Sequence, residues 1–430
     1  MADQIAALQV EGGALCDCAS NERIGSRYLR PCLLIEIMPL NLLVVGFSKP
    51  LVVQVMLAAH ACTESRTIAV CARGTRYLRY SVLCAGYEEI DFSGADDAAF
   101  VAMANAYANR HENLIVVPAD CAGSRMLNRV RNLLTMRIVA CPSEAALDRL
   151  EDKWNFHNFC RDLGLRMPAT IYVGDKQALH FASVAAQLGL PFIVKPTNED
   201  SSRGAWIVGS EEEYNRGIRD NAAYQYGPLI AQRYIAGTDV GLNFHANHGR
   251  VTAISIQRRD DYLHDGSPIR FFAEPCLQSV AGRIAAATDY DGVMNVDARI
   301  ESTTGEVYLF ESNPRFWRSL SASAWCGLNF VEECLRDAAP GETQRLLATG
   351  TADTYYHPLY RPGLWRHAIR GSGSRGKLAR LMFLDISIFL ASSKVLATRL
   401  AKRLGASLRR FARRRPPTLV SRLLSRVLEP

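Results

Sequence analysis

The stretch VYLFESNPRFWRSLSAS, Val307 to Ser323, carries an acid, an amide and a guanidinium in an order that loop composition alone would not produce. An apolar run ends on the carboxylate of Glu311, which is followed by the amide of Asn313 and the guanidinium of Arg315. Carboxylate and amide oxygens suit Mg²⁺, and a guanidinium suits phosphate oxygens. The stretch is therefore typical of a metal-bound phosphate site at the end of a strand.

A second carboxylate is expected to face the first. Asp297 lies in the predicted strand 292–300, which pairs with the predicted strand 306–312 across Thr303-Thr304-Gly305. Two carboxylates facing each other on paired strands repel by up to about 1 kcal/mol unless a cation lies between them. Asp297, Glu311 and Asn313 are therefore predicted to bind Mg²⁺, or Mn²⁺ in its place. A surface pair of carboxylates beside an Asn-Pro turn is the alternative.

Lys195 ends the apolar predicted strand 190–196. The polar turn TNEDSSRG, residues 197–204, follows it, and backbone amides of such a turn can bind phosphate oxygens. A lysine that reaches from a strand end into solvent is the alternative for this position.

The N-terminal part of the chain shows apolar strands that alternate with helices. Strands are expected at 40–46, 66–74, 112–120 and 137–141, and a helix with Pro50 in its first turn follows the first strand. This alternation predicts a parallel α/β sheet over 39–142. The turn after Gly46 lacks the GxGxxG spacing, which argues against a dinucleotide site there.

From Pro142 onward the pattern changes to mixed helices and hairpins. Helices are expected at 143–164, 176–189, 211–223, 280–289 and 318–338, strands at 167–173, 205–208 and 229–235, and a hairpin over 237–259 that turns at Asn247-His248-Gly249.

The order and spacing of these pieces resemble the ATP-grasp superfamily, in its carboxylate–amine and carboxylate–thiol ligase branch, which includes biotin carboxylase and carbamoyl-phosphate synthetase domains. The resemblance covers about residues 142–335, and 39–142 is similar to the α/β domain that precedes such a unit. It implies an α/β and α+β protein with four parts. These are a poorly patterned leader (1–38), a pre-ATP-grasp domain (39–142), a two-lobed ATP-grasp domain (143–345) and a C-terminal extension with basic amphipathic helices (346–430).

The resemblance also implies roles for individual residues. Lys153 and Lys195 match the two phosphate-binding lysines, and Arg315 matches the arginine that stabilises the transferring phosphoryl group. Asp297, Glu311 and Asn313 match the magnesium ligands, and Asp239 matches the acid that holds the ribose. The loop over the phosphates corresponds to Ser201, Ser202, Arg203 and Gly204, and the adenine-binding hinge to Gln232, Arg233, Tyr234 and Ile235.

The implied activity is an ADP-forming ligase. ATP phosphorylates a small-molecule carboxylate, and an amine or thiol attacks the resulting acyl phosphate. A small-molecule kinase and a nucleotide-binding module at a membrane surface, without turnover, are the alternatives. Two departures from the family pattern stand out: the phosphate loop has one glycine and two acids (Glu199 and Asp200, with Arg203 to offset them), and Asp297 replaces the more usual glutamate.

Two further segments are candidates for contact with the acceptor substrate. Phe316, Trp317 and Arg318 follow the Glu311 strand, although aromatic residues in such a position belong more often to the core. His264 and Arg270 lie in a polar loop and would meet a carboxylate there, and a solvated loop is the alternative.

Composition separates the C-terminal part from the rest. The chain has 430 residues, 48% of them apolar and 22% charged, as in globular proteins of two or three domains. Residues 370–430 carry 15 Lys/Arg against two acids, a net charge of +13, whereas residues 1–369 carry −6. Apolar stripes at 395–411 and 419–428 lie among these basic residues, which predicts peripheral binding to an anionic membrane surface. Packing on the acidic body or a homo-oligomer contact is the alternative, and nucleic acid is disfavoured because stacking aromatics are missing.

Scattered cysteines and the absence of an export pattern predict a cytoplasmic protein. The twelve cysteines show no zinc-ligand spacing, and four acidic residues precede any apolar run in 1–38. Met38 stands directly before the first predicted strand and is an alternative start. The apolar run 40–59 is interrupted by Lys49-Pro50, so strand, turn and helix are expected there rather than a membrane span.

Overall fold

The computed structural model describes residues 40–200, 202–259, 267–336, 345–346, 354–357, 361–385 and 388. The predictions for the leader, Ser201, His264 and the amphipathic stripes at 395–428 lie outside these described residues. Within them no helix is both long and apolar enough to cross a membrane.

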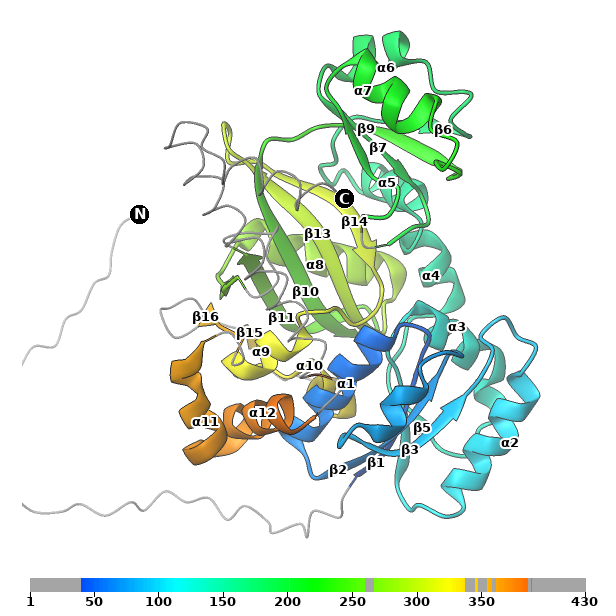
Figure 1. Cartoon of the computed structure of the whole chain (residues 1–430), viewed down its shortest axis with the longest axis vertical. Helices are drawn as coiled ribbons and strands as arrows, with labels where there is room; N and C mark the ends of the chain where they lie inside the picture. The colour runs from blue at the N-terminus through cyan, green and yellow to red at the C-terminus, as the bar shows by residue number, and fades with distance from the viewer. Residues whose placement is uncertain are drawn as a thin grey trace, which may run out of the picture. The chain divides into compact units, whose positions relative to one another are not determined.

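The N-terminal domain is a five-stranded parallel sheet in the order β3-β2-β1-β4-β5 (Figure 1). Its elements are β1 (Leu40–Gly46), α1 (Lys49–Cys62), β2 (Ser65–Cys71), β3 (Cys84–Glu89), α2 (Asp97–Ala108), β4 (Leu114–Pro118), α3 (Cys121–Val130) and β5 (Arg137–Ile138). Alternate residues of β1 enter two cores, one shared with α1 and the other with α2 and α3. The predicted parallel sheet is confirmed, and both its faces are covered.

The sequence did not predict β3, the edge strand of this sheet. Its residues, CAGYEE, are half-buried at most positions rather than forming an apolar run.

The strand order reverses between β1 and β4, and in open α/β sheets ligands bind at the carboxyl ends of the strands at such a point. Ser48, at the N-terminus of α1, donates its backbone N–H to Asp120, which follows β4 (2.5 Å).

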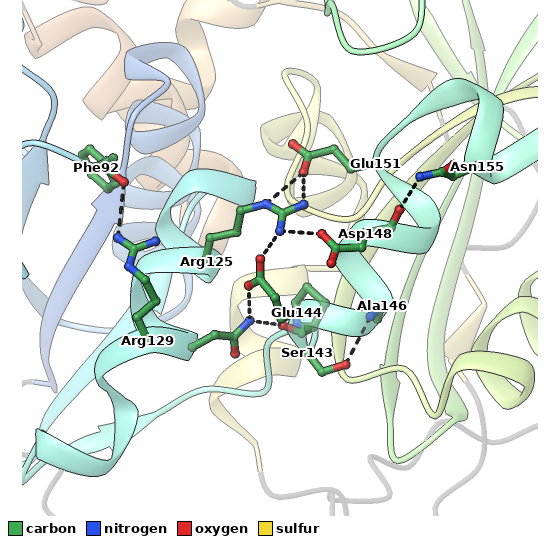
Figure 2. Close-up of polar contacts among 11 residues, drawn as sticks. Phe92, Arg125, Arg129, Ser143, Glu144, Ala146, Asp148, Glu151 and Asn155 are labelled. Atoms are coloured by element: carbon green, nitrogen blue, oxygen red, sulfur yellow. Dashed lines mark hydrogen bonds and ion pairs between the residues drawn. The ribbon is translucent and has the colours of Figure 1, made fainter. Parts of the chain in front are cut away.

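The helix predicted over 143–164 is two helices, α4 (Glu144–Leu150) and α5 (Lys153–Asp162). Ser143 caps α4, but Asp152 accepts the backbone N–H groups of Trp154 and Asn155 and so starts a new helix. This break makes Lys153 the first residue of α5. Arg125 of α3 forms ion pairs with Glu144, Asp148 and Glu151, which ties the N-terminal domain to α4 (Figure 2).

The next region forms a small lobe around a four-stranded antiparallel sheet in the order β6-β9-β7-β8. It contains β6 (Thr170–Val173), α6 (Phe181–Leu188), β7 (Phe192–Pro196), β8 (Trp206–Val208), α7 (Glu211–Tyr214), a π-helical turn (Asn215–Arg219) and β9 (Leu229–Arg233). One apolar cluster fills this lobe and includes Phe192, Val208 and Leu229. Lys195 lies on β7, the strand between β8 and β9.

A larger, mainly antiparallel sheet follows, in the order β14-β13-β10-β11-β12-β16, with β15 beside β11. Its elements are β10 (Gly237–Asn247), β11 (Arg250–Arg259), β12 (Ile269–Phe271), α8 (Pro275–Thr288), β13 (Gly292–Glu301), β14 (Val307–Asn313), β15 (Arg345–Leu346) and β16 (Thr354–Tyr355). The hairpins predicted over 237–259 and 292–312 are confirmed. The fold class, a parallel α/β domain followed by two α+β lobes, is therefore confirmed.

The helix predicted over 318–338 is also broken in two. α9 (Leu320–Cys326) ends at Gly327, whose φ of +108° suits glycine, and Asn329 caps α10 (Phe330–Leu335). Two further helices, α11 (Trp365–Arg370) and α12 (Gly373–Leu384), follow, and α12 packs on α1. The buried Asp385 after α12 accepts hydrogen bonds from Ser81 Oγ and from the backbone N–H of Val82 (3.1 Å for the latter). The described start of the C-terminal extension therefore packs on the N-terminal domain.

Candidate active site

A cavity of about 280 Å³ lies between the small lobe and the large sheet. Eight of the predicted site residues line this cavity. Those that line the cavity are Lys153, Lys195, Ser202, Arg203, Gln232, Asp239, Asp297 and Glu311. Residues from α5, β7, the loop after β7, β9, β10, β13 and β14 thus meet at one place, although they are spread over more than 150 positions of the chain.

The two acidic side chains lie opposite each other, as predicted. Asp297 of β13 pairs in register with Glu311 of β14. Burial, followed by repulsion from Glu311, raises the pKa of Asp297, whereas Lys153 and Lys195 outweigh burial and lower the pKa of Glu311. Two carboxylates held together in this way form a site whose repulsion a divalent cation would relieve.

Two lysines approach these acids, Lys195 from β7 of the small lobe and Lys153 from the start of α5, which packs on the large sheet. Lys153 is 7% exposed, and its Nζ lies 3.4 Å from Glu311 Oε2 and donates to the backbone oxygen of Glu199. Burial lowers the pKa of Lys195 to about 8, although Glu311 opposes the shift. Lys195 Nζ lies 5.5 Å from the ring centre of Phe310. Lys195 is half-buried, and it lines the cavity.

The loop after β7 neutralises its own acids. Arg203 forms ion pairs with Glu199 (3.3 Å) and Asp200 (2.9 Å). Gly204 has φ +69°, and a Cβ there would come within 2.9 Å of Pro196 and Tyr226, so the single glycine of the loop is required at this point. The negative charge that distinguishes this loop from the family pattern is thus largely paired within the loop.

The predicted adenine hinge reaches the cavity only in part. Gln232 lines the cavity and is fully buried; its Nε2 donates to Thr170 Oγ1 (2.9 Å), and its Oε1 has no partner among the described residues. Arg233, Tyr234 and Ile235 do not belong to the cavity lining. The backbone oxygen of Ile235 accepts from Arg299 Nη1 (2.7 Å).

Asp239, the predicted ribose acid, lines the cavity beside Arg299. Arg299 Nε donates to Asp239 Oδ1 (2.5 Å), and the guanidinium also lies 5.5 Å from the ring centre of Tyr234. This hydrogen bond orients the carboxylate. Its other oxygen, Oδ2, has no hydrogen-bond partner among the described residues.

Asn313 and Arg315 lie at the end of β14, next to the carboxylates. Arg315 Nη2 donates to Asn313 Oδ1 (2.8 Å), and Arg315 Nη1 donates to the backbone oxygen of Phe316 (2.9 Å). Asn313 Nδ2 lies 3.4 Å from Asp297 Oδ2. Two carboxylates and one amide are a donor set of hard oxygens, which fits Mg²⁺. No cluster of three or more His, Cys, Asp or Glu side chains suited to a metal occurs in the described part of the chain, so this mixed set is the candidate.

A second cavity, of about 340 Å³, adjoins the first. Asp297 and Ser202 line both cavities. The rest of its lining is Ser48, Leu51, Asp200, Gly241, Gln257, Arg259, Asn295, Arg315, Trp317, Arg318 and Ser319. Of these residues, Arg315, Trp317 and Arg318 are sequence-based candidates, and Asp200 is a predicted acid of the phosphate loop; the others were not predicted.

Some missed residues had a signal in the sequence and others had none. Asn295 stands two positions before Asp297, so it lies on the same face of the strand. Ser48 lies in the turn after β1 and Leu51 in the first turn of α1; this segment has no phosphate-binding motif, and only the fold brings the two residues here. Trp317 is 4% exposed and packs on Phe330 with ring centres 4.8 Å apart, so the core interpretation of the aromatic pair is confirmed while Trp317 also lines the cavity. Arg270 is exposed on β12 and lines neither cavity.

Comparisons with known proteins agree with this architecture. Residues 150–319 match the family model of the ATP-grasp domain. The arginine-specific large chain of carbamoyl phosphate synthase from Bacillus subtilis is 23% identical over 244 residues, which are 54% of this chain and 23% of that protein. The C-terminal section of the large chain from Methanopyrus kandleri is 26% identical over 187 residues, which are 40% of this chain and 34% of that one. The chain thus spans about a third or less of the length of these relatives.

Solved structures show the same fold at low sequence identity. N5-carboxyaminoimidazole synthetase from Staphylococcus aureus, in complex with ADP, is 14% identical with a TM-score of 0.54, over 72% of this chain and 80% of that one. L-amino acid ligase from Bacillus licheniformis is 15% identical with a TM-score of 0.52, over 69% of this chain and 73% of that one.

Proposed function

Because residues 150–319 form an ATP-grasp domain, we propose that this protein is an ADP-forming ligase that activates a small-molecule carboxylate as an acyl phosphate for attack by an amine. The observation that carries the proposal is that Asp297 and Ser202 line two adjoining cavities. One cavity holds both lysines, and the other holds three arginines. ATP in the first and a carboxylate in the second would meet at Asp297.

ATP binding is assigned to the first cavity. Lys153 and Lys195 bind the phosphates, with the loop residues Ser202, Arg203 and Gly204 over them. Asp239 accepts hydrogen bonds from the ribose hydroxyls, and Gln232 lies at the adenine end with an unpartnered buried oxygen. The domain boundaries at 142 and 345 and these residue roles are parts of the proposal.

Asp297, Glu311 and Asn313 would hold Mg²⁺. When bound, this ion would neutralise negative charge on the phosphates. Lys195 and Arg315 are the proposed catalytic residues. They stabilise negative charge on the phosphoryl oxygens from fixed positions, with little reorganisation during the reaction. An oxygen of the substrate carboxylate attacks the γ-phosphorus as the bond to the β-phosphate oxygen breaks, and ADP leaves.

The second cavity positions the carboxylate and then the amine. Arg259, Arg315 and Arg318 line it against Asp200 and Asp297, which favours an anionic acyl donor of metabolite size. The amine nitrogen attacks the acyl carbon, phosphate leaves, and the nitrogen loses a proton to solvent. A thiol would react in the same way. The L-amino acid ligase among the similar structures makes an amine acceptor the first choice over a thiol.

The test uses purified protein with Mg-ATP, pooled small carboxylic acids and hydroxylamine, and Glu311→Gln as the inactive control. ADP and a hydroxamate from the wild type alone are expected, and the mass of the hydroxamate identifies the acid. ADP with a stable phosphorylated product would instead identify a small-molecule kinase. Nucleotide binding without turnover on any acid would leave the nucleotide-binding module as the function.

A further inference from the structure

The three most exposed large apolar side chains of the described chain belong to two segments that lie far apart in the sequence. Ile369 of α11 is 79% exposed, Tyr80 is 73% exposed and Leu384 of α12 is 67% exposed. Tyr80 ends a 3₁₀ helix (Arg76–Tyr80) of the N-terminal domain. Single exposed apolar side chains are ordinary, whereas a group of them marks a surface that binds a partner.

The pairing of α11 with α12 connects Ile369 to Leu384. Arg380 of α12 donates from Nη1 to the backbone oxygen of Gly371, which directly follows α11 (3.0 Å). Ile369 stands two positions before Gly371, and Leu384 lies one helical turn after Arg380. The two exposed side chains therefore belong to one helix pair, drawn in orange in Figure 1, on either side of the Arg380 contact.

A buried carboxylate connects Leu384 to Tyr80. Asp385 directly follows Leu384 and accepts hydrogen bonds from the backbone N–H of Val82 (3.1 Å) and from the hydroxyl of Ser81. Val82 is itself 57% exposed and stands two positions after Tyr80. The exposed apolar group therefore extends from α11 across α12 to the segment 80–82.

Positive charge surrounds these apolar side chains. Residues 361–384 contain six Lys or Arg and no acid, and residues 73–82 contain three Arg and no acid. Asp385 is buried and hydrogen-bonded, and Glu89 of β3 pairs with Arg76 (3.4 Å), so neither acid cancels the charge of the other arginines. We call this surface the basic face; it comprises the apolar Tyr80, Val82, Ile369 and Leu384 and the basic Arg79, Arg366, Arg370 and Arg380.

The charge of the chain itself disfavours two alternative occupants of the basic face. Residues 389–430 follow Ile388 and contain eleven Lys or Arg and one acid, so they would repel the basic face rather than cover it. Two basic faces from two copies of the chain would repel each other in the same way.

The mixture of charged and aliphatic side chains favours a lipid surface over a nucleic acid. A nucleic acid would attract the arginines, but it binds through charge and aromatic stacking and would leave the exposed aliphatic side chains in water. An anionic bilayer accommodates both kinds of side chain, because its headgroups attract Lys and Arg and its interfacial region accepts Ile, Leu and Tyr.

We propose that the basic face docks on an anionic membrane surface, with Ile369, Leu384 and Tyr80 at the level of the lipid headgroups and the arginines against lipid phosphates. The positive charge of residues 389–430 adds to the attraction. No residue of the basic face lines either cavity, so the proposal does not depend on the ligase reaction.

The test measures sedimentation of the full chain with sucrose-loaded vesicles. We expect binding to phosphatidylcholine vesicles that contain about 30% phosphatidylglycerol, and little binding to phosphatidylcholine alone. The double variant Ile369→Glu/Leu384→Glu should bind at least about 10-fold more weakly, because it removes two apolar contacts and adds two negative charges.

Leu133→Glu/Leu190→Glu is the matched control. Both leucines are exposed, at 62% and 52%, they lie outside the basic face, and the change in net charge is the same. This variant should bind within about 2-fold of the wild type, because charges far from the membrane are screened. Both double variants should keep the melting temperature of the wild type, since all four side chains are exposed.

A tryptophan substitution reports the contact directly. The emission of Leu384→Trp should fall when brominated phosphatidylcholine replaces the unbrominated lipid, and it should fall by more than the emission of Leu133→Trp. The five tryptophans of the wild type give the same background in both variants.

Three outcomes would overturn the proposal. Equal vesicle affinity of Ile369→Glu/Leu384→Glu and the wild type would assign all binding to residues 389–430. Absence of wild-type binding to the anionic vesicles would exclude the membrane, and a dimer that this double variant dissociates would identify a second copy as the occupant. Loss of hydroxamate formation bears on the ligase proposal alone, since vesicle binding requires no nucleotide.

Discussion

Asp297 and Glu311 lie directly opposite each other on β13 and β14, and their pKa values shift in opposite directions. Lys153 pairs with Glu311 at 3.4 Å, whereas burial and the facing Glu311 leave Asp297 with a raised pKa. The ionised form of Asp297 is therefore unfavourable in the metal-free protein, and a bound cation would stabilise it. Stability and function are opposed at this residue.

Asp297→Asn is expected to stabilise the metal-free protein and to abolish turnover. The pKa of Asp297 is higher in the folded protein than its ordinary value of 3.8, so the folded state binds the proton more tightly and loses stability as pH rises through the raised pKa. At pH 8 the substitution removes that penalty, which we expect to be about 1 kcal/mol or more. Melting temperatures in EDTA measure it.

The gain from Asp297→Asn should shrink toward pH 4, where the carboxyl group is protonated, and Mg²⁺ with nucleotide should stabilise the wild type but not the variant. Glu306→Gln, on the same hairpin and outside the cavity, is the control and should show neither effect. A large fall in the melting temperature of Asp297→Asn in EDTA would contradict the account of stored charge.

Nucleotide affinity should depend on the protonation of Lys195. The pKa of Lys195 is lowered to about 8, and only its ammonium form binds phosphate strongly. The dissociation constant of Mg-AMP-PNP should be nearly constant below about pH 7 and should rise by up to about 10-fold per pH unit above about pH 8. Isothermal titration calorimetry should also show proton uptake on binding above pH 8.

Lys195→Arg supplies the control for that pH dependence, because a guanidinium stays charged over the whole range. Its affinity should be weaker than that of the wild type but flat between pH 8 and 9.5. An unchanged pH dependence in Lys195→Arg would assign the titration to another group.

Asp239→Asn tests the proposed ribose contact. The substitution keeps the shape of the side chain and removes the charge that accepts hydroxyl hydrogen bonds, so we expect ATP to bind about 10-fold more weakly. The wild type should also prefer ATP over 2′,3′-dideoxy-ATP, whereas the variant should bind the two alike. A variant that still discriminates between them would show that another residue reads the ribose, and Arg299, which pairs with Asp239, would be examined next.

Arg125→Met tests the ion pairs between α3 and α4 in Figure 2. Arg125 is 28% exposed and contacts three carboxylates, at 2.8 Å to Asp148 and 2.9 Å to Glu151, so its loss also leaves three negative charges close together. Because the carboxylates are 42% to 65% exposed, we expect a loss of only about 1 kcal/mol.

Thermal unfolding at low salt and in 0.5 M NaCl measures the effect of Arg125→Met, which should be smaller in high salt. Arg161→Met, which breaks an exposed pair with its neighbour Asp162, is the control and should leave the melting temperature unchanged. A salt-independent loss would mean that packing of the Arg125 side chain, rather than its charge, stabilises the junction.

Two helices that the sequence pattern predicts as continuous are each divided into two in the structure. The apolar periodicity over 143–164 and 318–338 is that of single helices, yet Asp152 and Asn329 cap new helices within both ranges. In each case a short polar residue binds backbone N–H groups and competes with helix continuation. The edge strand β3 was missed because an edge position does not require an apolar run.

Local sequence pattern was enough to predict most strands, the acid, amide and arginine at the end of β14, and the lysine at the end of β7, because residue type and a period of two are local properties. Which strands lie next to each other in a sheet follows instead from the three-dimensional fold. The register of the large sheet places Asn313 opposite Asn295 and Asn295 opposite Asn243, and the packing of the N-terminal domain brings Ser48 and Leu51 to the second cavity. Such contacts depend on long-range pairing that buries each strand against partners far away in the chain, and no local pattern encodes the partner.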